Sequence, residues 1–307
     1  MFELNAVFDQ GNTAGGEAEG LAAAFPTVEV RRSRLPGDSA LPVLPLAIDE
    51  WESPDFDFWK LDRRADELAE RGPFLLRLQG DGPRLDRAAE ELLTRCQRLA
   101  DRRNAASSRD GLFDRVLAGH RALHDLGKPL VRADYAHALD TWQWTLRLAP
   151  EAGLAVQLAA LLHDVERLAS EADARVEHRA ADYQGFKNAH ARRGAGLADA
   201  LLARLGVDAG TRGRTGRLIE RHELPPAPGD PDAADLALLN DADALSFFSL
   251  NSPGYLDYYG PEATRRKVAW TLARLRPSER RRLERMRLRP EVAAAVAAVL
   301  AAGGVAA

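Results

Sequence analysis

The sequence contains very little sulfur and very little lysine. Among 307 residues there are two methionines and one cysteine, Cys96. A single cysteine excludes an internal disulfide, and it leaves no set of thiolates that would favour a soft metal. Only four of the 42 basic residues are lysines, and the formal net charge is −4. No overall positive field therefore draws the chain to a nucleic acid polymer or to a membrane surface.

Long apolar runs are also missing. No stretch reaches the roughly 18 apolar residues that a membrane-spanning helix needs. The first residues lack the basic start and the apolar run of a signal peptide. The apolar residues at 292–307 are rich in alanine and interrupted by glycine, which favours a packed helix end. We therefore expect a cytoplasmic protein without a membrane segment.

Short apolar stretches separated by Gly and Pro predict strands in the first part of the chain. These stretches lie at residues 2–8, 28–31, 41–48 and 74–78. Pro42 and Pro45 confine the third stretch to a sheet edge or an extended loop, because proline cannot donate a hydrogen bond to a neighbouring strand. Apolar residues at helical spacing predict a helix over residues 86–100. Residues 1–110 are therefore interpreted as a small N-terminal α/β region.

From residue 113 onward the apolar pattern is helical almost throughout. A polar stretch at residues 101–111 precedes it and marks the expected domain boundary. The predicted helices cover residues 113–123, 134–148, 154–170, 186–205, 211–222, 233–248, 261–275 and 290–300. The fold class is therefore expected to be mainly α, with a helical bundle in residues 111–307.

Four of the seven histidines recur on these helices at similar intervals, together with two aspartates. The set comprises His137, His163, Asp164, His190, His222 and Asp243. Successive histidines, and the last aspartate, are 21 to 32 residues apart, which is about one helix plus a turn. A bundle core can gather such side chains around one point. Imidazole and carboxylate ligands together suit Fe, Mn, Co, Ni or Zn, so the set predicts a metal site.

The motifs around these residues resemble the HD-domain superfamily of metal-dependent phosphohydrolases. The superfamily's minimal pattern is matched by His137, by the run Ala-Ala-Leu-Leu-His163-Asp164 and by Asp243. The resemblance covers roughly residues 113–250. It implies an HD-type helical bundle that carries a metal site.

The resemblance also implies one or two divalent ions and assigns roles. His190 and His222 match the two extra histidines of the two-metal members, and Asp164 would bridge the two ions. Two such ions clamp a phosphoryl group and lower the pKa of a shared water. Asp164 and Lys187 are the expected catalytic residues. The basic residues expected to meet substrate phosphate are Lys187, Arg193 and Arg221.

The sequence offers two candidates for the last aspartate of the pattern. Residues 180–250 also resemble an uncharacterised HD-like family, through Tyr183-Gln-Gly-Phe-Lys-Asn-Ala-His190 and Leu239-Asn-Asp-Ala-Asp-Ala-Leu245. That resemblance favours Asp241. The Ala-Asp-x-Leu match to the superfamily favours Asp243, which we prefer.

A second His-Asp pair competes for the centre of the site. His124-Asp125-Leu-Gly-Lys128 has the Gly-Lys of the branch that hydrolyses cyclic dinucleotides, and His120 and His124 are spaced as a zinc pair would be. However, no apolar helix leads into His124 as residues 158–162 lead into His163. We therefore place the centre at His163.

The expected function is that of a phosphohydrolase acting on a nucleotide or small phosphate ester. A mixed-valent diiron oxygenase acting on a small organic substrate is the first alternative, and a non-catalytic regulatory metal-binding domain is the second. The cluster Arg265, Arg266 and Lys267 could grip an anionic substrate, but a solvated helix face is preferred. Residues 1–110 could be a substrate lid, a partner-binding module or an oligomerisation surface, so a homo-oligomer stays open.

Overall fold

The chain consists of two units. The computed structural model describes residues 2–8, 28–33, 40–53, 64, 68, 74–80, 104–286 and 288–302. The first unit comprises Met1–Arg102 with Glu284–Pro290, and the second comprises Arg103–Leu283 with Glu291–Ala307. The described part of the chain is mainly helical with a small sheet, so the predicted fold class, mainly α with a smaller N-terminal α/β region, is confirmed.

The first unit contains a sheet with the strand order β2-β1-β4-β3. Its strands are β1 (Phe2–Phe8), β2 (Val28–Ser33), β3 (Val43–Ala47) and β4 (Phe74–Gly80). Strand β1 is antiparallel to β2 and β4, whereas β3 is parallel to β4 and is followed by the short helix α2 (Ile48–Trp51). Pro45 lies in the edge strand β3, as its missing N–H predicts. The helix predicted over residues 86–100 lies outside the described residues.

The second unit is built from helices that follow one another through short connections. They are α5 (Leu112–Leu123), α6 (Pro129–Leu148), α7 (Leu154–Leu162), α8 (Arg167–Ser170), α9 (Tyr183–Arg204), α10 (Ala209–Arg221), α11 (Ala233–Ser246), α12 (Ser252–Arg274), α13 (Pro277–Arg280) and α14 (Pro290–Ala301), with the 3-10 turns η1 (Glu177–Arg179) and η3 (Arg281–Arg285) and the π-helical turn η2 (Phe247–Asn251). No helix of the described residues is both long and apolar enough to cross a membrane.

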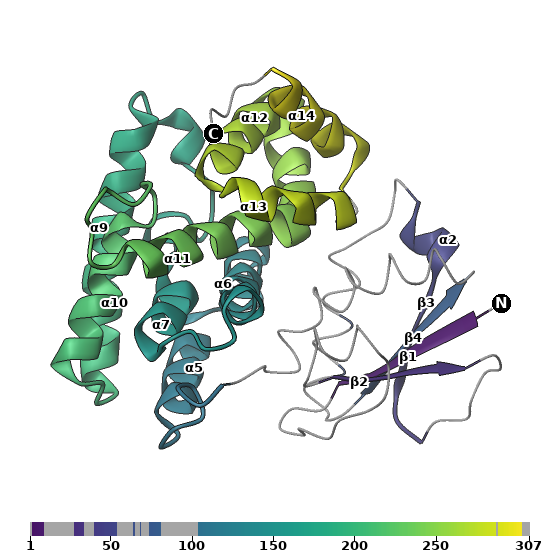
Figure 1. Ribbon diagram of the computed structural model, residues 1–307, viewed down its shortest axis with the longest axis horizontal. Helices are drawn as coiled ribbons and strands as arrows, with labels where there is room; N and C mark the ends of the chain where they lie inside the picture. The colour runs from purple at the N-terminus through teal and green to yellow at the C-terminus, as the bar shows by residue number, and fades with distance from the viewer. Residues whose placement is uncertain are drawn as a thin grey trace. The chain divides into compact units, whose positions relative to one another are not determined.

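Helix α7 forms the centre of this unit. It contacts α6, α10 and α11, and these helices surround it in Figure 1. Every residue from Val156 to Leu162 is buried, because all of them except Gln157 are apolar. Leu158 and Leu162 belong to the same core cluster as Phe113, Trp142 and other residues of the neighbouring helices. The end of α7 is therefore held rigidly at the middle of the bundle.

One side chain ties the start of the second unit to this core. Asn104 Nδ2 donates hydrogen bonds to the carbonyl oxygens of Pro150 and Ala152, both at 2.9 Å. Its Oδ1 accepts a hydrogen bond of 2.9 Å from Nε2 of Gln157, which is a buried residue of α7. The division between the units falls after Arg102, inside the polar stretch at residues 101–111 that marked the expected boundary.

Candidate metal centre

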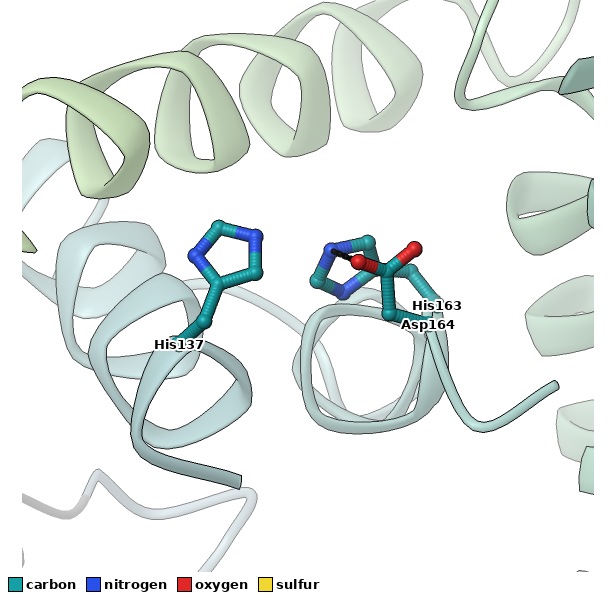
Figure 2. Close-up of side chains that lie close together, drawn as sticks. All are labelled: His137, His163 and Asp164. Carbon is teal, nitrogen blue, oxygen red and sulfur yellow. Dashed lines mark ion pairs between the residues drawn. The ribbon is translucent and has the colours of Figure 1, made fainter. Parts of the chain in front are cut away.

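The His163–Asp164 pair lies where α7 ends. His163 is the C-cap residue of α7 and is buried, and Asp164 follows in a turn before α8. His137 reaches the same place from the middle of α6, and Figure 2 shows the three side chains projecting into one space between the helices. One ligand atom from each of His137, His163 and Asp164 lies within 4.8 Å of the others, so this group could hold a metal ion.

A second group of potential ligands adjoins the first. Asp164, His190 and His222 also offer ligand atoms within 4.8 Å of one another. His190 comes from α9, and His222 caps the C-terminal end of α10. Asp164 belongs to both groups, which is the position that a carboxylate bridging two cations would occupy. The residues expected from the sequence are thus brought together from successive helices.

The four histidines share one hydrogen-bonding arrangement. Each uses its Nδ1 atom in a hydrogen bond with a neighbouring oxygen of the protein. The pairs are His137 with Ser246 Oγ (2.9 Å), His163 with the Ala160 carbonyl (2.9 Å), His190 with Glu166 Oε2 (2.6 Å) and His222 with the Ile219 carbonyl (2.7 Å). A partner on Nδ1 fixes the ring orientation and leaves Nε2 as the ligand atom, as in most metal-binding histidines.

The Nε2 atoms fit a metal site because they face carboxylates or lack partners. Nε2 of His163 is buried and has no hydrogen-bond partner among the described residues. Nε2 of His190 lies 2.9 Å from Asp164 Oδ1, and Nε2 of His137 lies 3.1 Å from Asp243 Oδ1. An unsatisfied buried nitrogen calls for an explanation, and coordination of an ion by His163 supplies one.

The two candidate aspartates on α11 face different neighbours. Asp243 Oδ1 lies 3.1 Å from His137 Nε2 and 3.7 Å from His163 Nε2, so its carboxylate is part of the cluster. Asp241 is fully buried elsewhere, where its Oδ1 accepts a hydrogen bond of 2.9 Å from the backbone N–H of Arg276. Its other oxygen pairs with the Arg276 side chain. The structure thus places Asp243 in the cluster and Asp241 outside it.

The protonation states of His163 and Asp164 favour metal binding. Burial outweighs the attraction of Asp164 and Asp243 and lowers the pKa of His163 to about 4, so this imidazole is neutral near pH 7. Burial alone would raise the pKa of Asp164, but Arg167 and the adjacent histidines hold it well below its ordinary value. Neutral imidazole and ionised carboxylate are the forms that bind a cation.

Two partly buried arginines that the sequence interpretation missed contact the carboxylates of the cluster. Arg167 Nε lies 2.9 Å from Asp164 Oδ2. Arg274 Nη2 lies 2.6 Å from Asp243 Oδ2, and its Nη1 donates a hydrogen bond to the His222 carbonyl at 2.8 Å. Arg167 could have been found from the sequence, because it follows Asp164 by one helical turn. Nothing in the sequence connects Arg274 with an aspartate 31 residues away.

The three basic residues expected to meet substrate phosphate lie in different surroundings. Lys187 is buried beside the cluster and forms an ion pair with Glu223, whose Oε1 lies 3.3 Å from Nε2 of His222. The exposed Arg193 donates a hydrogen bond to Glu166 at 2.8 Å. Arg221 pairs with Asp230 in the loop after α10. Of the three, Lys187 is the one enclosed with the histidine cluster.

The competing His124–Asp125 pair has a different environment. His120 and His124 are buried against Tyr135, and the two imidazole centroids lie 4.4 Å apart. Asp125 is exposed and caps a turn through the N–H of Gly127. Neither histidine belongs to a group of three potential metal ligands among the described residues.

Comparison with known proteins gives one relationship. A family model matches residues 116–296, which is more than half of the chain and includes every residue of the histidine–aspartate cluster. No curated protein matches the chain, and no solved structure does. The chain therefore belongs to the family described as Domain of unknown function (DUF4202).

Proposed function

We propose that the protein is a metal-dependent phosphohydrolase that uses two ions of a transition metal, in the manner of the HD-domain superfamily that its motifs resemble. The observation that carries this proposal is the sharing of Asp164 between two groups of potential ligands. In the first ion position the ligands would be His137, His163, Asp164 and Asp243. In the second they would be Asp164, His190 and His222. When bound, two such ions clamp a phosphoryl group and lower the pKa of a water that attacks phosphorus.

The protein's own side chains would hold and orient the reacting groups. Hydrolysis adds water across the phosphorus–oxygen ester bond and releases an alcohol and phosphate. The partly buried Arg274 and the buried Lys187 lie beside the ligands, so they would face the negative charge that develops on the leaving oxygen. Glu223 contacts both cations and fixes their positions. The enclosed site strengthens each of these electrostatic interactions relative to water.

The same ligands also support a second candidate, a diiron oxygenase acting on a small organic substrate. The observation that favours it is the completeness of the set, because four histidines and two aspartates gather at one place. Ligand identity does not separate the two chemistries, since imidazole and carboxylate serve both. The charge of the neighbouring side chains favours the hydrolase, because Arg274 and Lys187 suit an anionic substrate.

A phosphatase screen on protein purified without oxygen tests the proposal. Mononucleotides, dinucleotides and sugar phosphates are offered with Mn²⁺, Co²⁺, Ni²⁺ or Fe²⁺ added separately, and phosphate release and bound metal are measured. We expect phosphate release with at least one metal and two ions per chain. The absence of phosphate release with every metal, together with oxygen consumption by the ferrous protein, would establish the oxygenase instead. No activity in both assays would support a regulatory metal-binding domain.

Substitution of the shared carboxylate is the sharpest variant. Asp164→Ala removes the ligand common to both groups, so we expect loss of turnover and of most bound metal. Asp199→Asn is a matched control, because Asp199 is a largely exposed carboxylate on α9 that pairs with Arg212 on the surface. Retained turnover in Asp164→Ala would contradict the proposed centre.

A further inference from the structure

Side chains of alternating charge connect the two aspartates of the cluster. Between Asp164 and Asp243 they follow one another in the order Arg167, Glu177, Lys187, Glu223 and Arg274. Each neighbouring pair of opposite charges in this chain lies within 4.0 Å. Lys187 is the middle member, so it meets a carboxylate on either side.

Glu177 lies in the turn η1 and is a buried carboxylate that faces cations. Its Oε2 lies 3.3 Å from Arg167 Nη2 and 4.0 Å from Lys187 Nζ. Burial alone would raise the pKa of Glu177. The charges of Arg167, Lys267 and Lys187 outweigh burial and lower this pKa to about 2, so the carboxylate is ionised at neutral pH. The basic cluster on α12 is therefore not a purely solvated helix face, because Lys267 acts on a buried carboxylate.

The backbone that carries Glu177 is fixed independently of these cations. Oε1 of Glu171 accepts hydrogen bonds from the N–H groups of Val176 and Glu177, at 2.7 and 3.0 Å. The buried Arg175 forms a bidentate pair with Asp134 on α6, with nitrogen–oxygen distances of 2.7 and 2.8 Å. Bidentate pairs of this kind impose a definite geometry. The Glu177 carboxylate is thus held in place from its own segment, and it can position the cations that it meets.

Lys187 needs such a partner because a second cation lies near it. Burial would lower the pKa of Lys187, but the carboxylates of Glu223 and Glu177 raise it, so the ammonium keeps its charge. The positive charge of Arg167 acts in the opposite direction, so the two cations repel each other. Glu177 contacts both cations and offsets this repulsion. An ammonium has three N–H donors, so pairing with two carboxylates leaves one donor for a substrate oxygen.

We infer that Glu177 is a positioning residue that holds the Lys187 ammonium beside the metal centre against the repulsion of Arg167. Without this negative charge, Lys187 would be held from the side of Glu223 alone and would be pushed away from Arg167. Glu177 itself touches neither the proposed ligands nor the substrate, and it acts through Lys187. The inference rests on the proposed function, because that function assigns the substrate phosphate to Lys187.

Calorimetric titration of inorganic phosphate into the full Mn²⁺-loaded chain tests the inference. If Glu177 were only a negative charge near the site, Glu177→Gln would bind phosphate more tightly, because a repulsion is removed. A positioning role predicts the opposite sign. We expect about tenfold weaker phosphate binding, the loss of one charge-assisted contact, with unchanged metal content.

A double variant shows whether the effect passes through Lys187. Lys187→Gln should weaken phosphate binding by itself, and adding Glu177→Gln should then cause no further loss, because the residue that it positions is gone. Glu177→Asp keeps the charge and should bind phosphate more tightly than Glu177→Gln. The control is Glu262→Gln, which should match the wild type, because Glu262 is an exposed carboxylate paired with Arg266.

Four results would overturn the inference. They are the absence of phosphate binding by the wild-type protein, unchanged or tighter binding in Glu177→Gln, additive losses in the double variant, and loss of metal from Glu177→Gln. The last result would mean that Glu177 supports the ligands rather than Lys187. Failure of the proposed hydrolysis would be seen separately, as missing phosphate release from a protein whose phosphate binding still depends on Glu177 through Lys187.

Discussion

Glu166 orients the proposed metal ligand His190 and is not itself one of the proposed ligands. Its Oε2 accepts a hydrogen bond of 2.6 Å from Nδ1 of His190, and its Oε1 accepts one of 2.8 Å from Arg193. Burial would raise the pKa of Glu166, but the hydrogen bonds from His190, Arg193 and Ser170 lower it, so the carboxylate is ionised. An ionised partner fixes the ring and makes the opposite nitrogen a stronger ligand.

Glu166→Gln should therefore weaken metal binding while the fold is retained. The amide keeps the shape of the side chain but removes the charge on the His190 hydrogen bond, and loss of such a partner lowers metal affinity about 10- to 100-fold. Calorimetric titration with Mn²⁺ measures the change. Glu220→Gln is the control, because Glu220 is exposed on α10. Equal affinities in the two variants would show that Glu166 does not support the site.

The choice between Asp241 and Asp243 shows what a sequence pattern can and cannot determine at the scale of residues. The period of a helix places residues two apart on different faces, so the sequence indicates that only one of them can face the other ligands. Which face of α11 packs against α6 depends on tertiary packing, and the structure turns Asp243 toward His137. Burial of Lys187 against Glu223 is a tertiary effect of the same kind.

At the scale of elements, α9 and the end of α7 approach each other closely near the site. A Cβ atom at Gly194 would lie 3.3 Å from the carbonyl oxygen of His163. That oxygen is backbone and cannot rotate away, so the absence of a side chain permits the approach. Gly194 follows His190 by one turn, and both residues therefore face the His163–Asp164 turn. Gly196, on the same helix, would meet nothing within 4 Å.

Gly194→Ala and Gly196→Ala should accordingly have opposite effects. Alanine at position 194 must displace the His163 turn, which we expect to cost about 1–3 kcal/mol of stability and to weaken metal binding. Alanine at position 196 should stabilise the helix by about 0.5–1 kcal/mol. Chemical unfolding and Mn²⁺ titration measure the two effects. Similar unfolding and similar affinity in both variants would rule out this close approach.

Most helices were predictable from the spacing of apolar residues, but two interruptions were not. The segment predicted as one helix over residues 154–170 is α7 and α8 with a turn between them, although Val165 and Leu168 continue the apolar spacing. After α11 the chain enters the π-helical turn η2, although the sequence predicted that an ordinary helix continues to residue 248. Neither interruption contains a Pro or Gly that would mark it in the sequence. Both adjoin the histidine–aspartate cluster, and π-helical turns are frequent at functional sites in proteins.

At the scale of the whole molecule, the cluster lies within one of the two units. All six proposed ligands and the partners of their Nδ1 atoms lie between Arg103 and Leu283. The sequence predicted an α/β region and a helical region because their apolar periods differ. It did not predict the role of Asn104, because a polar residue in a polar stretch has the composition of a linker.

A fragment comprising residues 103–307 should therefore fold and bind metal with the stoichiometry of the full chain. The same fragment with Asn104→Ala should be less stable, because the carbonyl groups of Pro150 and Ala152 and the amide of Gln157 each lose a hydrogen bond. We expect a loss of about 1–3 kcal/mol. For a unit of this size each kcal/mol lowers the melting temperature by about 2–4 °C.

Thermal unfolding and metal analysis test both expectations. A fragment that keeps Asn104 but binds no metal would show that the first unit contributes to the site. An unchanged melting temperature in the variant would show that Asn104 is a linker residue after all.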